Sequence, residues 1–449
     1  MSSSLIEDVR CRLGAAGASV EAVTGGASAV ASLREVLAAR LSDPRKRRGV
    51  RHGLASLVSV LIAGVACGYG SVLAIADAAA GWDGPVLAAH GTRRHPVTGE
   101  FDPPSAATLG RIPALVDVDE LEAAFSEWIA GPALAAPVPR EPKPPARRTR
   151  RRASAALALR AVRSDGWVRA APGHPWLDPA VLGDPGHRAG VAAVAVDGKE
   201  RKLAKAGGAA KVHLLGALVH HNGAVIAQTR VDRKANEITH FKPLLHRLPL
   251  DGVAVTTDAM QTTREHARWL VQDKHAHYLF PVLGNQPGLS ARLDALPWAS
   301  TAVAAATTEI TRGRIETRTI RVLPVPPDLD FPHARQAVLI ERYVTIKKKR
   351  RWVMRNCEAV LYLTSLDSTH ADPADLLALI RGHWSVEHLH WLRDVIWDED
   401  KSTLRTGNAP QVMSALTNLA ITLFRLQEVT KIKAETRRNA QNPTEQSNY

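Results

Sequence analysis

Residues 189–284 contain the feature that most constrains the fold, a regular alternation of short apolar strands with amphipathic helices. Three segments, VAAVAV, KVHLLGALV and AVIAQTRV, have the length and β-branched content of strands. Two segments with helical spacing, ANEITHFKPLLHRL and QTTREHARWLVQD, are followed by the further strands GVAVTTDA and HYLFPVLG. The predicted order is therefore three strands, helix, strand, helix, strand. An antiparallel meander followed by right-handed crossovers gives a mixed α/β sheet.

The connection between the second and third predicted strands supports the meander. It contains Asn222-Gly223, a pair typical of tight hairpins. The same order of elements occurs in RNase H-like domains, in which the first and fourth strands lie side by side. We therefore predict an α/β fold with an RNase H-like mixed sheet, a β-rich insertion and a preceding α-helical domain.

The length of 449 residues predicts two or three domains. Residues 1–136 have helical patterns, and residues 137–188 begin as a Pro-rich and Arg-rich linker. The RNase H-like domain is predicted over residues 189–430. It includes the β-rich insertion at about residues 295–365, whose segments predict mostly antiparallel strands. Residues 431–449 are polar and are expected to be a frayed tail.

Several helix boundaries can be predicted from capping residues. Ser105 is a candidate N-cap, and Asp117 or Asp119 is a candidate for the next helix. A later helix is predicted to begin at Asp372, with Pro373 in its first position. Residues 53–76 carry no charge and are long enough to span a bilayer. Two glycines interrupt them, so a pair of buried helices is the favoured interpretation and a membrane span the alternative.

The charge balance indicates a polyanionic partner. Lys and Arg outnumber Asp and Glu by 58 to 44, and the isoelectric point is near 10.0. We expect nucleic acid rather than a membrane surface. The three cysteines form no CxxC pair, which argues against a disulfide framework or a cysteine-based zinc site. The N-terminus lacks the pattern of a signal peptide, so a cytoplasmic location is expected.

Two carboxylates follow predicted strands. Asp197 is expected to end the first strand and Asp258 the fourth. Asp197-Gly198 taken alone favours an ordinary turn. If the two strands are neighbours, however, both side chains reach one edge of the sheet, and their mutual repulsion requires a cation or a proton. Carboxylate oxygens suit Mg²⁺ or Mn²⁺.

A third acid lies in a predicted helix near the C-terminus. Helical spacing aligns Ile380, Trp384, Glu387 and Trp391 in one stripe, which predicts that Glu387 interrupts a buried apolar face. A buried acid needs a partner. Three acids could bind two ions about 3.5–4 Å apart, the arrangement used for in-line phosphoryl displacement. The spacing of His383, Glu387 and His390 would also suit zinc, a less favoured alternative because no cysteine supports it.

An ordered set of short stretches resembles the DDE transposases of bacterial insertion sequences, in the ISAs-type branch that includes the H-repeat-associated proteins. The stretches cover most of residues 30–426 in the family's order. They are PSAATLGRI, AVDGKERK, RKANEI, VTTDAMQTTREHA, GNQP, GRIETR, IRGHWSVEHLHWLRDVIWDEDKS and RTGNAPQVMSALTNLAITLFR.

The resemblance implies a function and a set of site residues. Asp197, Asp258 and Glu387 would be the catalytic acids and the ligands of two Mg²⁺ or Mn²⁺ ions. The partners would be double-stranded DNA, as terminal inverted repeats and as target, bound by a homodimer near the nucleoid. Relatives with a hairpin mechanism carry Tyr, Arg, Glu and Lys around the third acid. Three of these positions differ here, so hairpin chemistry is not inferred.

Other polar residues are candidate DNA contacts. Each has an alternative as an ordinary surface, turn or second-layer residue. The basic side chains of the β-rich insertion, including the KKKRR run at 347–351, would suit a DNA backbone if they share one face. The candidates are Lys199, Asn285, Gln286, His383, Arg312 and Arg314.

Three functions compete. The first is a transposase that cuts transposon ends and joins the freed 3′-hydroxyls to target DNA. The second is a decayed or domesticated copy that binds transposon ends without cutting them. Leu283 keeps this one open, because relatives often have lysine there. The third is a metal-dependent nuclease without strand transfer, which the sequence does not separate from the first.

Overall fold

The computed structural model describes residues 27–48, 50–134, 191–201, 212–231, 237–311, 313–349, 351–402, 404 and 407–441. The predicted linker at 137–188 lies outside these residues. The chain divides into two compact units. Unit 1 contains the described residues within Met1–Ala135, Val194–Pro249 and Trp384–Tyr449. Unit 2 contains the described residues within Ala136–Ala193 and Leu250–His383.

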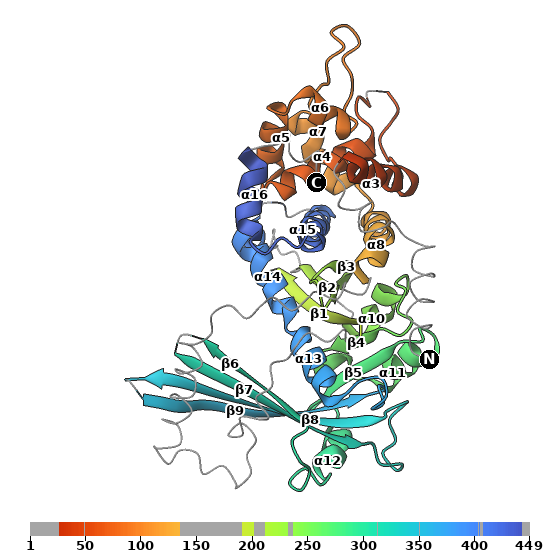
Figure 1. The fold of residues 1–449 in the computed structure, drawn as a ribbon. Helices are drawn as coiled ribbons and strands as arrows, with labels where there is room; N and C mark the ends of the chain where they lie inside the picture. Colours follow the sequence, from red (N-terminus) through yellow and green to blue (C-terminus); the bar gives the residue numbers. More distant parts are fainter. Residues whose placement is uncertain are drawn as a thin grey trace. The chain divides into compact units, whose positions relative to one another are not determined.

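Unit 1 begins with a set of helices (Figure 1). The Ser105 hydroxyl accepts a hydrogen bond from the Thr108 amide, and Asp117 Oδ1 accepts from the amides of Asp119 and Glu120. The predicted caps at Ser105 and Asp117 are thus confirmed. The helices are α3 (Ala27–Arg40), α4 (Leu54–Ala66), α5 (Val72–Ala80), α6 (Gly84–Ala89), α7 (Ala106–Leu115) and α8 (Val118–Leu134).

The uncharged segment at residues 53–76 forms the expected pair of helices, α4 and α5. A Cβ added to Gly64 would lie 2.4 Å from a carbon of Ile75, so glycine permits their close approach. Within the described chain, no helix combines the length and the apolar character that crossing a membrane requires. The buried pair is the correct interpretation.

Three antiparallel strands follow in unit 1. β1 (Ala193–Arg201), whose first residue belongs to unit 2, pairs with β2 (Val212–Val219), and β2 pairs with β3 (Val225–Val231). The connection between β2 and β3 is the predicted hairpin. Gly223 has a φ of 73°, and Asn222 Oδ1 accepts a hydrogen bond from the Ala224 amide at 2.9 Å. Helix α10 (Glu237–Leu245) comes next.

The C-terminal helices of unit 1 are α14 (Ser385–Ile396), η3 (Glu399–Lys401), α15 (Ala409–Leu426) and α16 (Ile432–Gln441). The side chains of α15 share one hydrophobic core with α4, α7, α8 and β3. The expected frayed tail is wrong for α16, because Ile432 is buried and Asn439 Nδ2 donates to the Ala66 carbonyl at 3.4 Å. Residues 442–449 lie outside the described residues.

Unit 2 contains a mixed sheet, as predicted. β4 (Ala254–Thr257) and β5 (His277–Val282) are parallel, whereas β9 (Arg351–Thr364) pairs with β5 in the antiparallel direction. The Ala254 amide donates to the Ala192 carbonyl at 2.8 Å, so β4 begins beside the residue that precedes β1. Its helices are η2 (Ala259–Gln261), α11 (Arg264–Gln272), α12 (Pro287–Asp294) and α13 (Pro373–His383).

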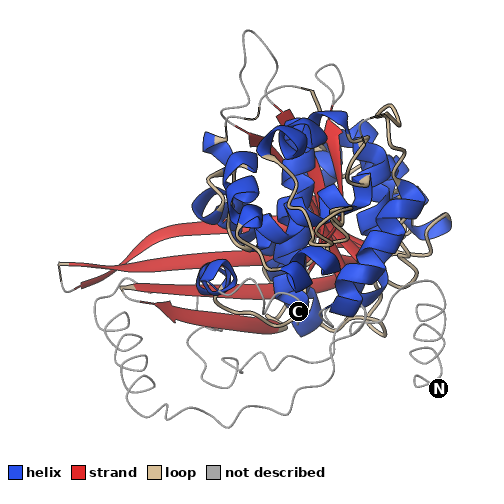
Figure 2. Ribbon diagram, turned by 90° about the horizontal axis from the view of Figure 1, so that it is seen from above, coloured by secondary structure: helices blue, strands red, loops and turns tan. Residues whose placement is uncertain are grey.

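The predicted insertion continues this sheet with long antiparallel strands, which Figure 2 shows in red. They are β6 (Ala305–Thr311), β7 (Arg314–Pro324), β8 (Gln336–Lys348) and β9. Their order from β5 is β9, β8, β7, β6. Leu279, Ile320 and Val338 are among the buried residues that pack the sheet against α13. The inserted strands therefore extend the sheet that contains β4 and β5.

Candidate active site

Asp197 lies within β1, not at its end. It pairs with Gly216 of β2, and the ladder continues as far as Arg201, which pairs with Val212. The expectation that Asp197 ends the strand is therefore wrong. The Asp-Gly pair favours a turn locally, but β2 supplies backbone partners that keep the chain extended. The carboxylate consequently projects from a face of the sheet.

That face of β1 is turned toward helix α14. Alternation places Ala195, Asp197 and Lys199 on one side of the strand, and Ala195 packs in the core that contains α14 and α15. Asp197 and Lys199 line a small pocket together with four residues of α14, the rest of the lining coming from β2, β3 and α15. The four residues are Val386, Leu389, His390 and Arg393.

An ion pair joins β1 to α14. The Lys199 ammonium donates to Asp394 Oδ2 at 2.7 Å and to the His390 carbonyl at 3.4 Å. Only 8% of Lys199 is exposed, whereas the Asp394 side chain is 34% exposed, so water reaches the contact from the Asp394 side. The pair fixes the position of α14 along the strand that carries Asp197. Sequence inspection missed it, although the opposite charges of Lys199 and Asp394 were visible.

Contacts on the opposite face of β1 explain why position 198 is a glycine. A Cβ added there would lie 2.2 Å from Glu237 Oε1 and 2.6 Å from His213 Nε2. His213 and Glu237 themselves form an ion pair at 2.6 Å, which raises the pKa of His213. Glycine after Asp197 thus makes room for this pair, and the Asp-Gly sequence has a packing cause rather than a turn.

Glu387 lies on α14, on a face that differs from the prediction. Glu387 is exposed, and the flanking Trp384 and Trp391 are 55% and 53% exposed. The expected buried stripe is wrong because α13 ends at His383 and α14 begins at Ser385, so the counted residues span two helices.

Glu387 shares one side of α14 with Asp394, because seven residues are close to two helical turns. Asp394 is the residue that contacts Lys199. Glu387 itself is exposed and is not among the α14 residues that line the pocket with Asp197.

His383 and His390, the two histidines considered with Glu387 as a zinc site, both have lowered pKa values. Burial lowers the pKa of His383 to about 4, and His383 Nδ1 lies 3.1 Å from Thr256 Oγ1 in unit 2. Burial, with Arg393 and Lys199 adding to it, lowers the pKa of His390 to about 3. A neutral imidazole attracts phosphate less than a cation does. The predicted DNA contact of His383 stays a prediction.

Asp258 lies in unit 2, directly after β4 as predicted. It is half-buried, and its Oδ1 accepts a hydrogen bond from the Gln261 amide at 3.3 Å, capping η2. Asn285 donates to the Ala259 carbonyl at 2.5 Å, and Gln286 donates to the Thr262 carbonyl at 3.0 Å. Asn285 and Gln286 thus support the segment that follows Asp258.

The basic row of the insertion is compensated by acids. Arg314 and Arg318 both form ion pairs with Glu316, and Arg342 contacts the same carboxylate at 2.7 Å. Arg312 lies outside the described residues. The sequence RGRIETRTIR already contained Glu316 between the arginines, a signal that the row is not a purely cationic face.

The fit of a metal ion depends on the three acids. Their carboxylates are the donors that Mg²⁺ and Mn²⁺ prefer. Asp197 and Glu387 belong to unit 1, and Asp258 belongs to unit 2. Across the residues that the structure describes, no three or more His, Cys, Asp or Glu side chains form a group that could hold an ion. The donor chemistry fits but no metal cage is formed, so we derive no step through a bound ion.

Comparison with known families decides the ancestry of the chain. Residues 191–423, more than half of the chain, match the family model described as the transposase DDE domain. The chain belongs to this transposase family. Residues 36–129 match a second model, described as DDE_Tnp_1-associated. The resemblance inferred from the ordered motifs is thereby confirmed, and all three candidate acids lie within the first match.

Two relatives of this chain are themselves named as putative transposases. "Putative transposase YncI" of Escherichia coli O157:H7 is 32% identical over 241 residues, which are 52% of this chain and 61% of that protein. "H repeat-associated putative transposase YhhI" of Escherichia coli strain K12 is 30% identical over 276 residues, 57% of this chain and 69% of that protein. The chain thus spans less than two thirds of the length of YncI.

Among solved structures, a piggyBac transposase synaptic complex with hairpin DNA aligns with a TM-score of 0.37 at 10% identity. The alignment covers 94% of this chain and 78% of that one. A similarity at this level carries no argument about the fold or the site.

Proposed function

We propose that this protein is an insertion-sequence transposase, which cuts DNA at transposon ends and joins the freed 3′-hydroxyls to target DNA. The observation that carries the proposal is the match of residues 191–423 to the transposase DDE domain. Double-stranded DNA is the proposed partner, as terminal inverted repeats and as target. A homodimer is proposed because two ends must be held together, and the nucleoid is the proposed location.

The proposed catalytic and metal-binding residues are Asp197, Asp258 and Glu387. Asp197 faces α14, Glu387 is an exposed residue of that helix, and Asp258 directly follows β4. Two Mg²⁺ or Mn²⁺ ions would supply activation of the attacking oxygen and stabilisation of the leaving oxygen. An RNase H-like topology for this region is supported by the observed order of strands and helices and by the hydrogen bond from Ala254 to Ala192.

The residues around the acids have proposed roles of their own. Lys199 would fix α14, and with it Glu387, relative to Asp197. Asn285 and Gln286 would support the segment after Asp258, and the exposed Asn285 would also contact DNA. Contacts of His383, Arg312 and Arg314 with DNA are proposals on sequence grounds.

The test uses purified full-length protein, Mg²⁺ or Mn²⁺, and labelled duplexes that carry the inverted repeats flanking the gene. We expect cleavage followed by joining to a target duplex. Asp258→Asn should reduce cleavage at least about 1,000-fold while DNA affinity changes little, since it removes a proposed metal ligand without changing size. Retention of cleavage by this variant would contradict the assignment of Asp258.

A second candidate is a DNA-binding protein that no longer cuts. Leu283, 44% exposed beside Asn285, favours it, because the resembling family often has lysine there. Binding without cleavage by the unaltered protein would support this candidate, and restoration of cleavage by Leu283→Lys would show that Leu283 is the cause. Cleavage without joining would indicate a nuclease.

A further inference from the structure

The far end of the β8–β9 hairpin carries an unusual concentration of positive charge. We define the basic tip as Lys347, Lys348, Lys349, Arg351 and Arg355, all of which are exposed. No acidic residue occurs between positions 343 and 357. Among the described side chains, none of the five forms an ion pair.

The charges closer to β5 are arranged in the opposite way. Glu316 contacts three arginines, Glu341 contacts Arg321, and Glu358 contacts Arg342 at 2.8 Å. Burial acts to raise the pKa of Glu316, but the hydrogen bond from Arg342 and the neighbouring arginines lower it below its ordinary value. The arginines here are therefore compensated by acids within the sheet, whereas the five described side chains of the basic tip form no ion pair.

The backbone at the basic tip is regular, so the charges have defined positions. The ladder between β8 and β9 continues to Lys348, which lies directly opposite Arg351. Lys347 pairs with Trp352 on the other face, and the Lys347 amide donates to the Gly313 carbonyl of the β6–β7 turn at 2.8 Å. Cations thus occur on both faces at the end of the β8–β9 hairpin, next to the β6–β7 turn.

The like charges at the end of the β8–β9 hairpin destabilise the pairing of the two strands when no partner is bound. Two like charges directly opposite each other destabilise a pair of strands. The Lys348–Arg351 pair is such a case, and Lys349 in the turn adds a third charge in a left-handed conformation with a φ of 46°. A polyanion bound across the tip would remove this repulsion.

We propose that the basic tip binds the phosphate backbone of double-stranded DNA. This inference depends on the proposed function for the identity of its partner, but not on the three acids. The cations on both faces of the hairpin end contact backbone phosphates, and this contact is independent of sequence.

The decisive measurement is the affinity for a random-sequence 30-base-pair duplex at several salt concentrations, without divalent metal. The tip variant combines Lys347→Gln, Lys348→Gln, Lys349→Gln, Arg351→Gln and Arg355→Gln. Each lost phosphate contact lowers the slope of log affinity against log salt by about 0.9. We expect the slope to fall by about 3 to 4 and the affinity to fall at least about 30-fold at moderate salt.

A matched control removes the same net charge elsewhere. It replaces five exposed cations by Gln, at Arg268, Arg335, Lys431, Lys433 and Arg437. The control should lose less than about threefold in affinity, with little change of slope. An equal loss in both variants would show that only net charge matters and would overturn the proposal.

Three further results bear on the proposal: the melting temperature, the choice of ligand and the cleavage of DNA. The tip variant should keep or raise the melting temperature, because it removes the Lys348–Arg351 repulsion. If it unfolds, the single variant Lys348→Gln is compared instead and must lower the slope by about 0.9. Binding of anionic vesicles or single-stranded RNA, but not of the duplex, by the unaltered protein overturns the proposal. Failure to cleave DNA, with a tip-dependent slope retained, overturns only the proposed enzyme activity.

Discussion

Lys199 and Asp394 are the pair of single residues on which the geometry of unit 1 depends most directly. Their 2.7 Å contact joins β1 to α14, with Lys199 buried and the Asp394 side chain 34% exposed. Removing Asp394 leaves the Lys199 ammonium poorly solvated, a cost of about 1–3 kcal/mol, and loss of either partner frees α14 to shift along the strand. Lys199→Gln and Asp394→Asn should each slow cleavage at least about 30-fold, with duplex affinity nearly unchanged.

The reciprocal exchange Lys199→Asp with Asp394→Lys is the control for this positioning role. It restores opposite charges at the same place, so it should recover at least about tenfold of the lost cleavage rate. The Mn²⁺ concentration that gives half-maximal cleavage should rise in each single variant and return in the exchange. Unchanged metal dependence in all three proteins would limit the pair to a structural role.

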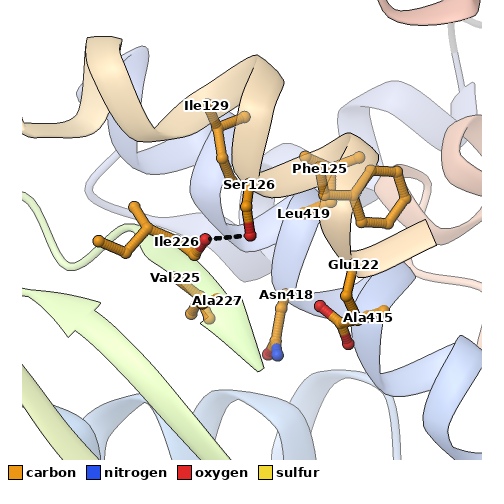
Figure 3. Close-up of a pocket in the computed structure, with 10 residues that line it drawn as sticks. All are labelled: Glu122, Phe125, Ser126, Ile129, Val225, Ile226, Ala227, Ala415, Asn418 and Leu419. Atoms are coloured by element: carbon orange, nitrogen blue, oxygen red, sulfur yellow. Dashed lines mark hydrogen bonds between the residues drawn. The ribbon is translucent and has the colours of Figure 1, made fainter. Parts of the chain in front are cut away.

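At the scale of elements, a half-buried acid, Glu122, connects α8, β3 and α15. Gln228 of β3 donates to Glu122 of α8 at 2.9 Å, and Asn418 of α15 donates to Gln228 at 2.7 Å. Figure 3 shows Glu122, Ser126 and Asn418 around the same small pocket, with the Ser126 hydroxyl donating to the Ile226 carbonyl. Burial raises the pKa of Glu122 to about 8, so the folded protein keeps this carboxyl protonated at neutral pH.

The raised pKa of Glu122 predicts a pH-dependent stability. Between pH 4.5, where the unfolded chain loses this proton, and pH 8, only the folded state retains it, so stability falls as the pH rises. Glu122→Gln mimics the protonated acid and keeps the bond from Gln228. In urea unfolding, this variant should nearly match the unaltered protein at pH 4.5 and be about 4 kcal/mol more stable at pH 8.

Glu127→Gln, which changes an exposed acid on the same helix, is the matched control. Its difference from the unaltered protein should be the same at both pH values. If the difference between Glu122→Gln and the unaltered protein also stays constant with pH, Glu122 is ionised in the folded state and the proposed protonation is wrong.

Elements were predicted well wherever the signal is local. The Asn222-Gly223 hairpin and the Ser105 cap depend on residues within a few positions of one another, and both are confirmed. Asp197 was assigned to a strand end because the Asp-Gly pair favours a turn, whereas pairing with β2 decides its conformation. Glu387 was assigned to a buried stripe because a helix break at Trp384 cannot be seen in the spacing. The Asp197 error arises because strand pairing is not local in sequence.

At the scale of the whole molecule, the ends of the sequence share one core. Leu37 of α3, Leu61 of α4 and Phe125 of α8 belong to the same buried cluster as Leu416 of α15 and Ala195 of β1. Asn222, in the β2–β3 turn, also donates to the Ala133 carbonyl at the end of α8. The N-terminal helices therefore supply part of the hydrophobic interior that β1–β3 and α15 require.

This shared core predicts that residues 189–449 do not fold without the N-terminal helices. Their removal would expose the apolar side of α15, and the area lost exceeds what a domain of marginal stability tolerates. The truncated chain should lack near-UV circular dichroism and a cooperative thermal transition, whereas the full chain has both. Adding residues 1–136 as a separate polypeptide should restore the transition, because the missing surface is apolar and complementary. A cooperative transition in the truncated chain alone would show that the sheet and α15 form a core without α3–α8.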